Sequence, residues 1–496
     1  MSYFMGIDLG TSSTKTLIMD ENGKTAGIGN ASYGIQIPQI SYAEQDPLEW
    51  WEAVKKSIKK ALQEAGIQGR DIAGIGFSGQ MHGMVALDEN KQLACNAIIH
   101  LDQRSSLELK EIRTLAGNLM TEELLNQPSA GMMISSLYWL KKHQKETYDR
   151  IRYVMSPKDY ISFRLCGEIG TEYTDAGAAL GFSVKNYRWC TELFKRLELK
   201  EEIWPPVHKS FEIAGNVTAE AAEETGLSTS TKVIYGAGDS MAALTGNGII
   251  ESGFITCNIG TSSQLAVVVD KPIFDPKMRI QTWCHTVPKR WVVQSGTLNG
   301  GSVLSWLRNN MLKTDETFAQ LDQEAGLTPA GADGLYFLPY LAGERTPYND
   351  PYAKGVFFGL SMMHQQGHLV RSAMEGILFN LKECLYILDE MKVDRSRLIA
   401  SGGAARGVTW KQIQADVLNM PVYSTNVKEE ACQGAAILAA VGVGFFKDIK
   451  EGCQAAVTMS PEVVEPILEN VKIYNEKQEV FHDLYYSVKK LYPRIV

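Results

Sequence analysis

The chain has 496 residues, of which 45% are hydrophobic and 21% charged, and this composition predicts a folded protein with at least two domains. Its net charge of -8 at pH 7 gives no support for nucleic acid or an anionic membrane as a partner. The eight cysteines are scattered without a CxxC pair, which predicts reduced thiols rather than a disulfide framework or a zinc site.

The beginning of the chain runs directly into a strand pattern and lacks the basic and apolar regions of a signal peptide. The longest apolar run, residues 434–446, is too short to span a bilayer. We therefore expect a cytoplasmic protein.

A hairpin is predicted at the start of the chain, with strands over residues 3–7 and 16–19 and Asp8 at the end of the first. Its tip is made of the small residues Gly10, Thr11, Ser12 and Ser13. Successive N–H groups and hydroxyls in such a tip suit an anion, and Lys15 can add a charge. The Walker A spacing is absent and a strand follows instead of a helix. A structural turn and a phosphate site both remain open.

The same design recurs at mid-chain, where strands over residues 253–259 and 264–269 flank a second small tip. This tip reads Gly260, Thr261, Ser262 and Ser263. The repeat, placed near the start of each half, predicts two related domains, residues 1–246 and 247–496. Two phosphate-gripping hairpins across a cleft would suit a nucleoside triphosphate.

Residues 74–79 match GxGxxG, the fingerprint of dinucleotide-binding folds. Residues 80–87, followed by a turn at 88–90, predict a hairpin rather than the helix that this fingerprint requires. We therefore reject a dinucleotide site.

Polar or conformationally adaptable side chains stand at two predicted strand ends in this part of the chain. Gln80, Met81 and His82 follow the first, and Asp102 and Arg104 follow the second. His82 could be a buried histidine with one hydrogen bond, and Asp102 with Arg104 could be a surface ion pair of little energetic weight. These structural alternatives stand beside a binding role.

A strand over residues 232–235, a glycine turn and a helix over residues 240–244 surround Asp239. A carboxylate at the mouth of such a turn can accept a proton from a bound hydroxyl. Aspartate is also a good helix N-cap. Both interpretations remain open from this segment alone.

Elsewhere, Asp46 followed by Pro47 predicts the start of a helix, and further helices are predicted from residue 156 and over residues 301–307, 367–388, 408–418 and 434–440. We expect the last of these, which is made of small residues, to pack tightly against a sheet. Residues 171–181 predict a loop of small residues, and residues 399–405 a strand that ends in a glycine turn. His364 and His368 lack the glutamate of HExxH, so we expect them to be solvated rather than to bind a metal.

The sequence resembles the FGGY family of carbohydrate kinases through seven collinear motifs, which extend over nearly the whole chain. They begin at Asp8, Gln80, Gly238, Gly260, Gly343, Gly355 and Gly402. The resemblance implies an α/β fold of two ribonuclease H-like domains, as in actin-like ATPases, around a hinged cleft. It also implies that ATP and Mg²⁺ are cofactors and that a sugar is the acceptor.

Residue roles follow from the resemblance as well. Asp239 would be the general base and Asp8 the Mg²⁺ residue. The other implied contacts are Gly10, Thr11, Ser12, Ser13 and Lys15 to phosphate, Gly260 and Thr261 to ATP, Gly301, Ser305, Gly402 and Gly403 to the nucleoside, and Gln80, Met81, His82, Asp102 and Arg104 to the sugar.

The motifs are most similar to those of family members that phosphorylate D-xylulose, which implies transfer to its C5 hydroxyl. His100 and Leu101 replace a Trp-x pair that commonly precedes the aspartate, and Ser136 stands where a lysine is usual. Another ketose, a polyol or a sugar acid, such as ribulose or gluconate, therefore remains open. An actin-like ATPase and a non-catalytic sugar sensor are alternatives of a different class. A monomer and a homodimer are both compatible with the sequence.

Overall fold

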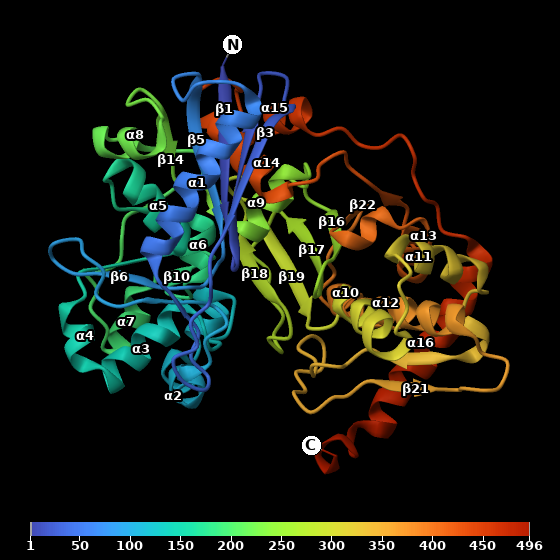
Figure 1. Cartoon of the computed structure of the whole chain (residues 1–496). Coiled ribbons are helices and arrows are strands. Elements are labelled where there is room, and N and C mark those ends of the chain that lie inside the picture. The colour runs from blue at the N-terminus through green and yellow to red at the C-terminus, as the bar shows by residue number, and fades with distance from the viewer. Residues whose placement is uncertain (1, 496) are drawn as a thin grey trace.

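The structure is a computed structural model that describes residues 2–495, and it contains two main sheets of similar topology (Figure 1). In order across the first sheet, the strands are β13 (Ile213–Asn216), β14 (Lys232–Ile234), β5 (Ile72–Gly79), β1 (Tyr3–Leu9), β2 (Ser13–Met19) and β3 (Thr25–Ser32). Across the second they are β18 (Gln281–Cys284), β19 (Trp291–Thr297), β17 (Ser263–Val269), β16 (Phe254–Ile259), β22 (Arg397–Ser401) and β23 (Val422–Tyr423). The α/β two-domain fold expected from the sequence is confirmed.

Both predicted hairpins form, and they occupy equivalent places in the two sheets. β1 pairs antiparallel with β2 and parallel with β5, whereas β16 pairs antiparallel with β17 and parallel with β22. The first tip is closed by a hydrogen bond from the Gly10 N–H to the Ser13 carbonyl, and the second by one from the Gly260 N–H to the Ser262 carbonyl, each at 3.0 Å. The internal repeat of the sequence is therefore a repeat of structure.

The helices begin where the sequence supplies caps. α1 (Pro47–Ala65) starts with proline, and the side chain of Asp46 accepts a hydrogen bond from the Leu48 N–H. α5 (Pro157–Cys166) has a capping box with Ser156. The other predicted helices form as α10 (Gly301–Trp306), α12 (Gln366–Glu390), α13 (Val408–Leu418) and α14 (Glu430–Gly442).

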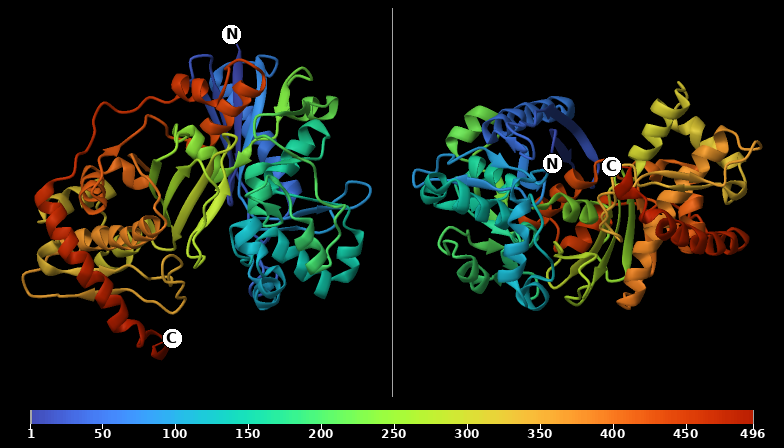
Figure 2. Two further views of the ribbon diagram at one scale, coloured as in Figure 1. Left: turned by 180° about the vertical axis from the view of Figure 1, so that it is seen from behind. Right: turned by 90° about the horizontal axis from the view of Figure 1, so that it is seen from below.

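α14 belongs to the C-terminal half by sequence but packs against β1 and β5 of the first sheet, so the prediction that it packs tightly on a sheet is confirmed. It also crosses α9 (Asp239–Gly246), where a Cβ on Gly434 would lie 1.9 Å from the Ala242 carbonyl oxygen. Figures 1 and 2 show α14 and α15 (Ile449–Ala456) beside β1, after which the chain returns to the other half and forms α16 (Leu468–Lys489). The two halves are thus joined through a close helix crossing.

The expectation of a loop over residues 171–181 was wrong, because this segment forms β9 (Thr171–Glu172) and α6 (Tyr173–Ala178). The Glu172 side chain caps the helix by accepting the N–H groups of Thr174 and Asp175, a signal that the small residues concealed. All eight cysteines are free thiols. None of the helices formed by residues 2–495 has the length and the apolar run that crossing a bilayer requires.

Candidate active site

Three neighbouring parallel strands end side by side, and the predicted chemical residues lie at these ends. In register, Asp8 of β1 lies opposite Ser78 of β5, and Ser78 lies opposite Ala237 of β15 (Ala237–Gly238). Gln80 follows β5 directly, and Asp239 follows β15. Ligand sites of open α/β sheets lie at this carboxyl edge. The fold therefore brings together side chains that are more than 200 positions apart in the sequence.

The Asp8 carboxylate accepts a hydrogen bond from the Ser78 hydroxyl at 2.7 Å, and the carbonyl of Asp8 accepts one from the Thr14 hydroxyl at 3.0 Å. Burial raises the pKa of Asp8 above its usual value, although the Ser78 hydrogen bond and the charge of Lys15 act in the opposite direction. Ser78 was not among the site residues predicted from the sequence. Its signal was the strand register, which places a hydroxyl beside the first aspartate.

Asp239 is the first residue of α9, and Gly238 is the N-cap, so the interpretation of Asp239 as the cap was wrong. Its carboxylate accepts a hydrogen bond from the N–H of Ser240 at 2.6 Å. Burial and then the nearby charge of Asp8 raise the pKa of Asp239 to about 7. A carboxylate with this pKa can exchange a proton at neutral pH.

The residues after β5 line up beside this turn. The Met81 side chain packs against Gly238, since a Cβ there would lie 2.6 Å from Met81 Cγ. The His82 ring Nδ1 lies 2.9 Å from the carbonyl oxygen of Ala178, so Nδ1 carries the proton. Burial lowers the pKa of His82 to about 4. The ring is therefore neutral, and its Nε2 is an acceptor suited to a hydroxyl.

Three of the residues predicted for sugar binding, Asp102, Arg104 and Gln80, are buried and hydrogen-bonded to other groups of the protein. Asp102 is 0% exposed, and its carboxylate accepts hydrogen bonds from the Ala43 N–H at 2.7 Å and from the Arg104 guanidinium at 2.9 and 3.0 Å. Arg104 also binds Glu44 at 2.6 Å and lies 3.8 Å from the centre of the Tyr42 ring. Asp102 and Arg104 therefore form a buried ion pair, whereas the structural alternative from the sequence was a surface ion pair. Gln80 is also buried, and its amide nitrogen donates to Gln45 at 2.9 Å.

The second hairpin borders a pocket of about 680 Å³. Five of the predicted nucleotide residues line it, namely Gly260, Thr261, Gly301, Ser305 and Gly403. Apolar walls come from Leu304, Phe318 and Trp410. Gly402 lies next to the lining residues and adopts φ 74°, where glycine is favoured. A pocket with one apolar wall and a glycine-rich rim is suited to a flat, polar-edged ring.

Lys15, predicted to meet phosphate, forms an ion pair with Glu429 at 2.6 Å. Glu429 directly precedes α14, so this ion pair joins the first hairpin to the C-terminal half of the chain. Trp283 of β18 likewise reaches across, with its ring centre 5.5 Å from that of His82. Glu429 and Trp283 were not predicted from the sequence, because only tertiary contacts bring them to the site.

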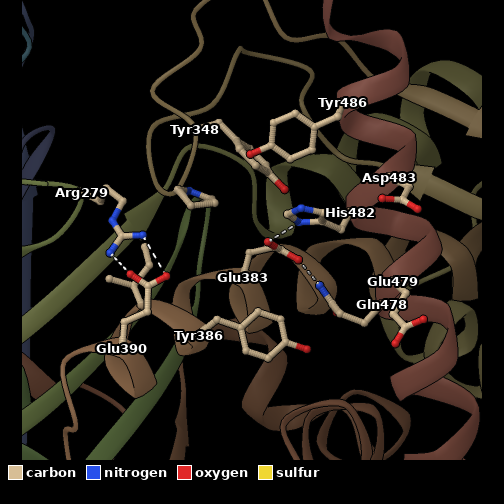
Figure 3. A pocket seen from close by; sticks show the side chains of 12 residues that line it. Arg279, Tyr348, Glu383, Tyr386, Glu390, Gln478, Glu479, His482, Asp483 and Tyr486 are labelled. Atoms are coloured by element: carbon tan, nitrogen blue, oxygen red, sulfur yellow. Dashed lines mark hydrogen bonds and ion pairs between the residues drawn. The ribbon is translucent and has the colours of Figure 1, made fainter.

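A second pocket of about 620 Å³ lies between α12, α16 and the loop containing Tyr348 (Figure 3). Both of its basic side chains are paired with acids, Arg279 with Glu390 at 2.6 Å and His482 with Glu383 at 3.0 Å. Glu479 and Asp483 add further negative charge. Phosphate would be repelled here, and none of the residues predicted for catalysis lines this pocket.

Two sheets of actin-like topology, paired aspartates at the strand ends and two small hairpin tips define a phosphotransferase of the sugar-kinase class. The chain matches the FGGY family of carbohydrate kinases in both its N-terminal domain, over residues 3–246, and its C-terminal domain, over residues 255–443. The protein belongs to this family and is a carbohydrate kinase.

Individual relatives agree with this assignment. The chain is 34% identical to a xylulose kinase of Staphylococcus epidermidis over 487 residues, 98% of this chain and 97% of the relative. It is 30% identical to a gluconokinase of Bacillus subtilis over 508 residues, 100% of this chain and 98% of the relative. The crystal structure of a ligand-bound xylulose kinase from Lactobacillus acidophilus matches with a TM-score of 0.93 and 28% identity, covering 100% of both chains.

Proposed function

We propose that the protein transfers the γ-phosphate of ATP to the C5 hydroxyl of D-xylulose. The observation that carries this proposal is the meeting of Asp8, Asp239 and the first hairpin tip at one edge of the sheet, beside His82. Several relatives, including those of Staphylococcus epidermidis and Bacillus subtilis, are named xylulose kinases. Their similarity supports D-xylulose as the acceptor.

The carboxylates of Asp8 and Asp239 at this edge of the sheet fit the ligand preference of Mg²⁺. The described residues contain no group of three or more His, Cys, Asp or Glu side chains that could hold a metal ion. Mg²⁺ keeps several of its waters and uses one or two carboxylates together with substrate phosphates. Asp8 would hold it through water, and the ion would neutralise charge on the transferred phosphate.

The side chains of the protein then supply position and a proton acceptor. Asp239 accepts the proton of the sugar hydroxyl as the hydroxyl oxygen bonds to the γ-phosphorus of ATP and the bond from that phosphorus to the β–γ bridging oxygen breaks, which releases ADP. The hairpin tips orient the phosphates. The neutral His82 accepts a hydrogen bond from a sugar hydroxyl and orients the acceptor. Water competes with the sugar for phosphate, so we expect the cleft to close after the sugar binds.

The experiment that tests the function is ADP release with Mg·ATP and a panel of D-xylulose, L-xylulose, D-ribulose, gluconate, glycerol and pentitols. Selective turnover with D-xylulose supports the proposal. Gluconate is the second candidate, because the gluconokinase relative matches the whole chain. Turnover with gluconate or another acceptor, but not with D-xylulose, would identify that acceptor as the substrate instead. ATP hydrolysis that no sugar accelerates would contradict kinase function.

We place the nucleoside in the pocket of about 680 Å³, which predicts a specific effect of Gly403→Leu. A Cβ on Gly403 would lie 3.8 Å from its nearest neighbour, the Ile259 carbonyl oxygen, so the backbone tolerates it. The added side chain fills the pocket, and we expect the KM for ATP to rise about tenfold, with the KM for the sugar unchanged. Val408→Leu, at the start of α13 and outside the residues that line the pocket, is the control. Equal KM values for ATP in the two variants would contradict this location.

If Asp239 is the general base, the rate of the reaction should depend on pH. Burial and the Asp8 charge raise the pKa of Asp239 to about 7, and only the ionised carboxylate can accept a proton. We therefore expect kcat/KM for the sugar to fall tenfold per pH unit below about pH 7. The measurement is an initial-rate profile at saturating Mg·ATP, with the nucleotide complex held constant by added Mg²⁺. A flat profile down to about pH 5.5 would argue against Asp239 as the base.

A further inference from the structure

The turn that carries Asp239 is tied at three points to side chains or backbone outside it. The hydrogen bonds run from the Gly238 N–H to Thr174 Oγ1 (2.8 Å), from the Gly236 N–H to the Ser210 carbonyl oxygen (2.8 Å) and from Lys158 Nζ to the Tyr235 carbonyl oxygen (3.2 Å). These contacts hold the backbone immediately before Asp239. The position of the Asp239 carboxylate therefore depends on them.

Glu172 connects all three ties. Its carboxylate accepts hydrogen bonds from the hydroxyls of Thr174 at 2.7 Å and Ser210 at 2.9 Å, and it lies 3.5 Å from Lys158 Nζ. Glu172 is 0% exposed and also accepts the Thr174 N–H at the start of α6. Because the Thr174 hydroxyl donates its proton to Glu172, its oxygen keeps a lone pair that accepts the Gly238 N–H.

The charges around Lys158 make this network costly to bury. Lys158 Nζ lies 2.6 Å from Asp159 and 3.2 Å from Asp175, and all these side chains are buried. Burial raises the pKa of Asp175 well above its usual value, although the charge of Lys158 acts in the opposite direction. Buried ion clusters add little stability compared with well-packed apolar residues. We therefore infer that the charged cluster around Lys158 serves to hold the turn before Asp239 in one conformation, since the cluster is not needed for the stability of the fold.

We propose that Thr174 is a positioning residue for phosphoryl transfer. Its hydroxyl, oriented by Glu172, holds the Gly238 amide and thereby sets where Asp239 meets the sugar hydroxyl. This inference rests on the proposed role of Asp239 as the base. Thr174 itself is 0% exposed, so in this proposal it acts through the Gly238 amide.

Thr174→Val tests the proposal, because valine keeps the shape of threonine and removes the hydroxyl. A displacement of a reacting group by about 1 Å can cost about 100-fold in rate, so we expect kcat to fall about 10- to 100-fold. The KM for ATP remains within about twofold, since the nucleotide pocket is formed by the other half of the chain. Thr174→Ser restores the hydroxyl and keeps kcat within about threefold of the wild type.

The matched control is Thr225→Val. The Thr225 hydroxyl is equally buried, donates to the Ala221 carbonyl at 2.6 Å and accepts the Leu227 N–H at 3.3 Å, but it lies outside the site. We expect this variant to keep its kcat. If kcat falls in both valine variants, the loss of any buried threonine hydroxyl is sufficient to explain the effect, and the proposal is overturned.

A readout independent of activity is amide hydrogen exchange in peptides covering residues 235–240. Thr174→Val increases exchange there and Thr225→Val does not, if Thr174 holds the turn. Unchanged exchange, an unchanged kcat in Thr174→Val, or a serine variant as slow as the valine variant would each overturn the proposal. If Thr174→Val does not fold, Ser210→Ala is tested by the same criteria, because it removes another hydrogen bond to Glu172.

Kinetic assays use whichever panel sugar the wild type phosphorylates. If the wild type phosphorylates none of them, the proposed function fails, whereas hydrogen exchange still decides whether Thr174 holds the turn. The two proposals are therefore separable.

Discussion

Asp239→Asn is expected to lower kcat by about 100- to 10,000-fold, the range that general-base catalysis contributes, while ATP still binds. Asparagine has nearly the same shape but cannot accept the proton of the sugar hydroxyl. Steady-state kinetics and nucleotide titration provide the measurement. The control is Asp448→Asn, an exposed aspartate that caps α15 and lies outside the site. Retained turnover in Asp239→Asn would remove this residue as the base.

Asp239→Asn is expected to lower activity but to raise stability at high pH. This difference distinguishes loss of the catalytic base from loss of the fold. The pKa of Asp239 is raised to about 7 in the folded state, so the folded protein binds this proton more tightly than the unfolded chain. The wild type therefore loses stability as the pH rises from about 4 through about 7. We expect Asp239→Asn to melt at a higher temperature than the wild type at pH 8 and at nearly the same temperature at pH 4, where both side chains are neutral.

Gly434→Ala is expected to destabilise the fold by about 1–3 kcal/mol or more, as overpacking does. In an open helix this exchange would stabilise by about 1 kcal/mol. Here the new Cβ would lie 1.9 Å from the Ala242 carbonyl oxygen, where α14 crosses α9, and neither helix backbone can yield cheaply. The reverse contact is equally close, since a Cβ on Gly246 would lie 1.9 Å from the Glu430 carbonyl oxygen.

Urea unfolding followed by circular dichroism measures this effect. Gly34→Ala is the matched control, because a Cβ there meets nothing within 4 Å. If Gly434→Ala unfolds at the same urea concentration as Gly34→Ala, the helix crossing is not close-packed in solution. Because α9 begins at Asp239, we also expect Gly434→Ala to lose activity at a lower urea concentration than the one at which it unfolds.

The sequence by itself determined the elements with strong local signals. Small residues between two apolar runs predicted both hairpins, and proline with a preceding aspartate predicted α1. The separation of the two Gly-Thr-Ser-Ser tips predicted the repeated sheet. Asp8 and Asp239 could be singled out because each follows an apolar strand and lies beside a glycine-rich turn. These features depend on neighbours within a few residues, where spacing and residue type are informative.

Only the tertiary structure decided which polar groups lie together at the strand ends and which are paired elsewhere in the protein. Asp102 also follows a predicted strand, yet its carboxylate accepts hydrogen bonds from Arg104 and the Ala43 N–H in the interior. Lys15 meets Glu429 because α14 returns to the first sheet across more than 400 residues of chain. The small residues near Thr174 gave no local sign of the tie to Gly238, since the hydrogen bond joins positions 64 residues apart. Long-range contacts arise when distant elements pack, so short-range patterns do not encode them.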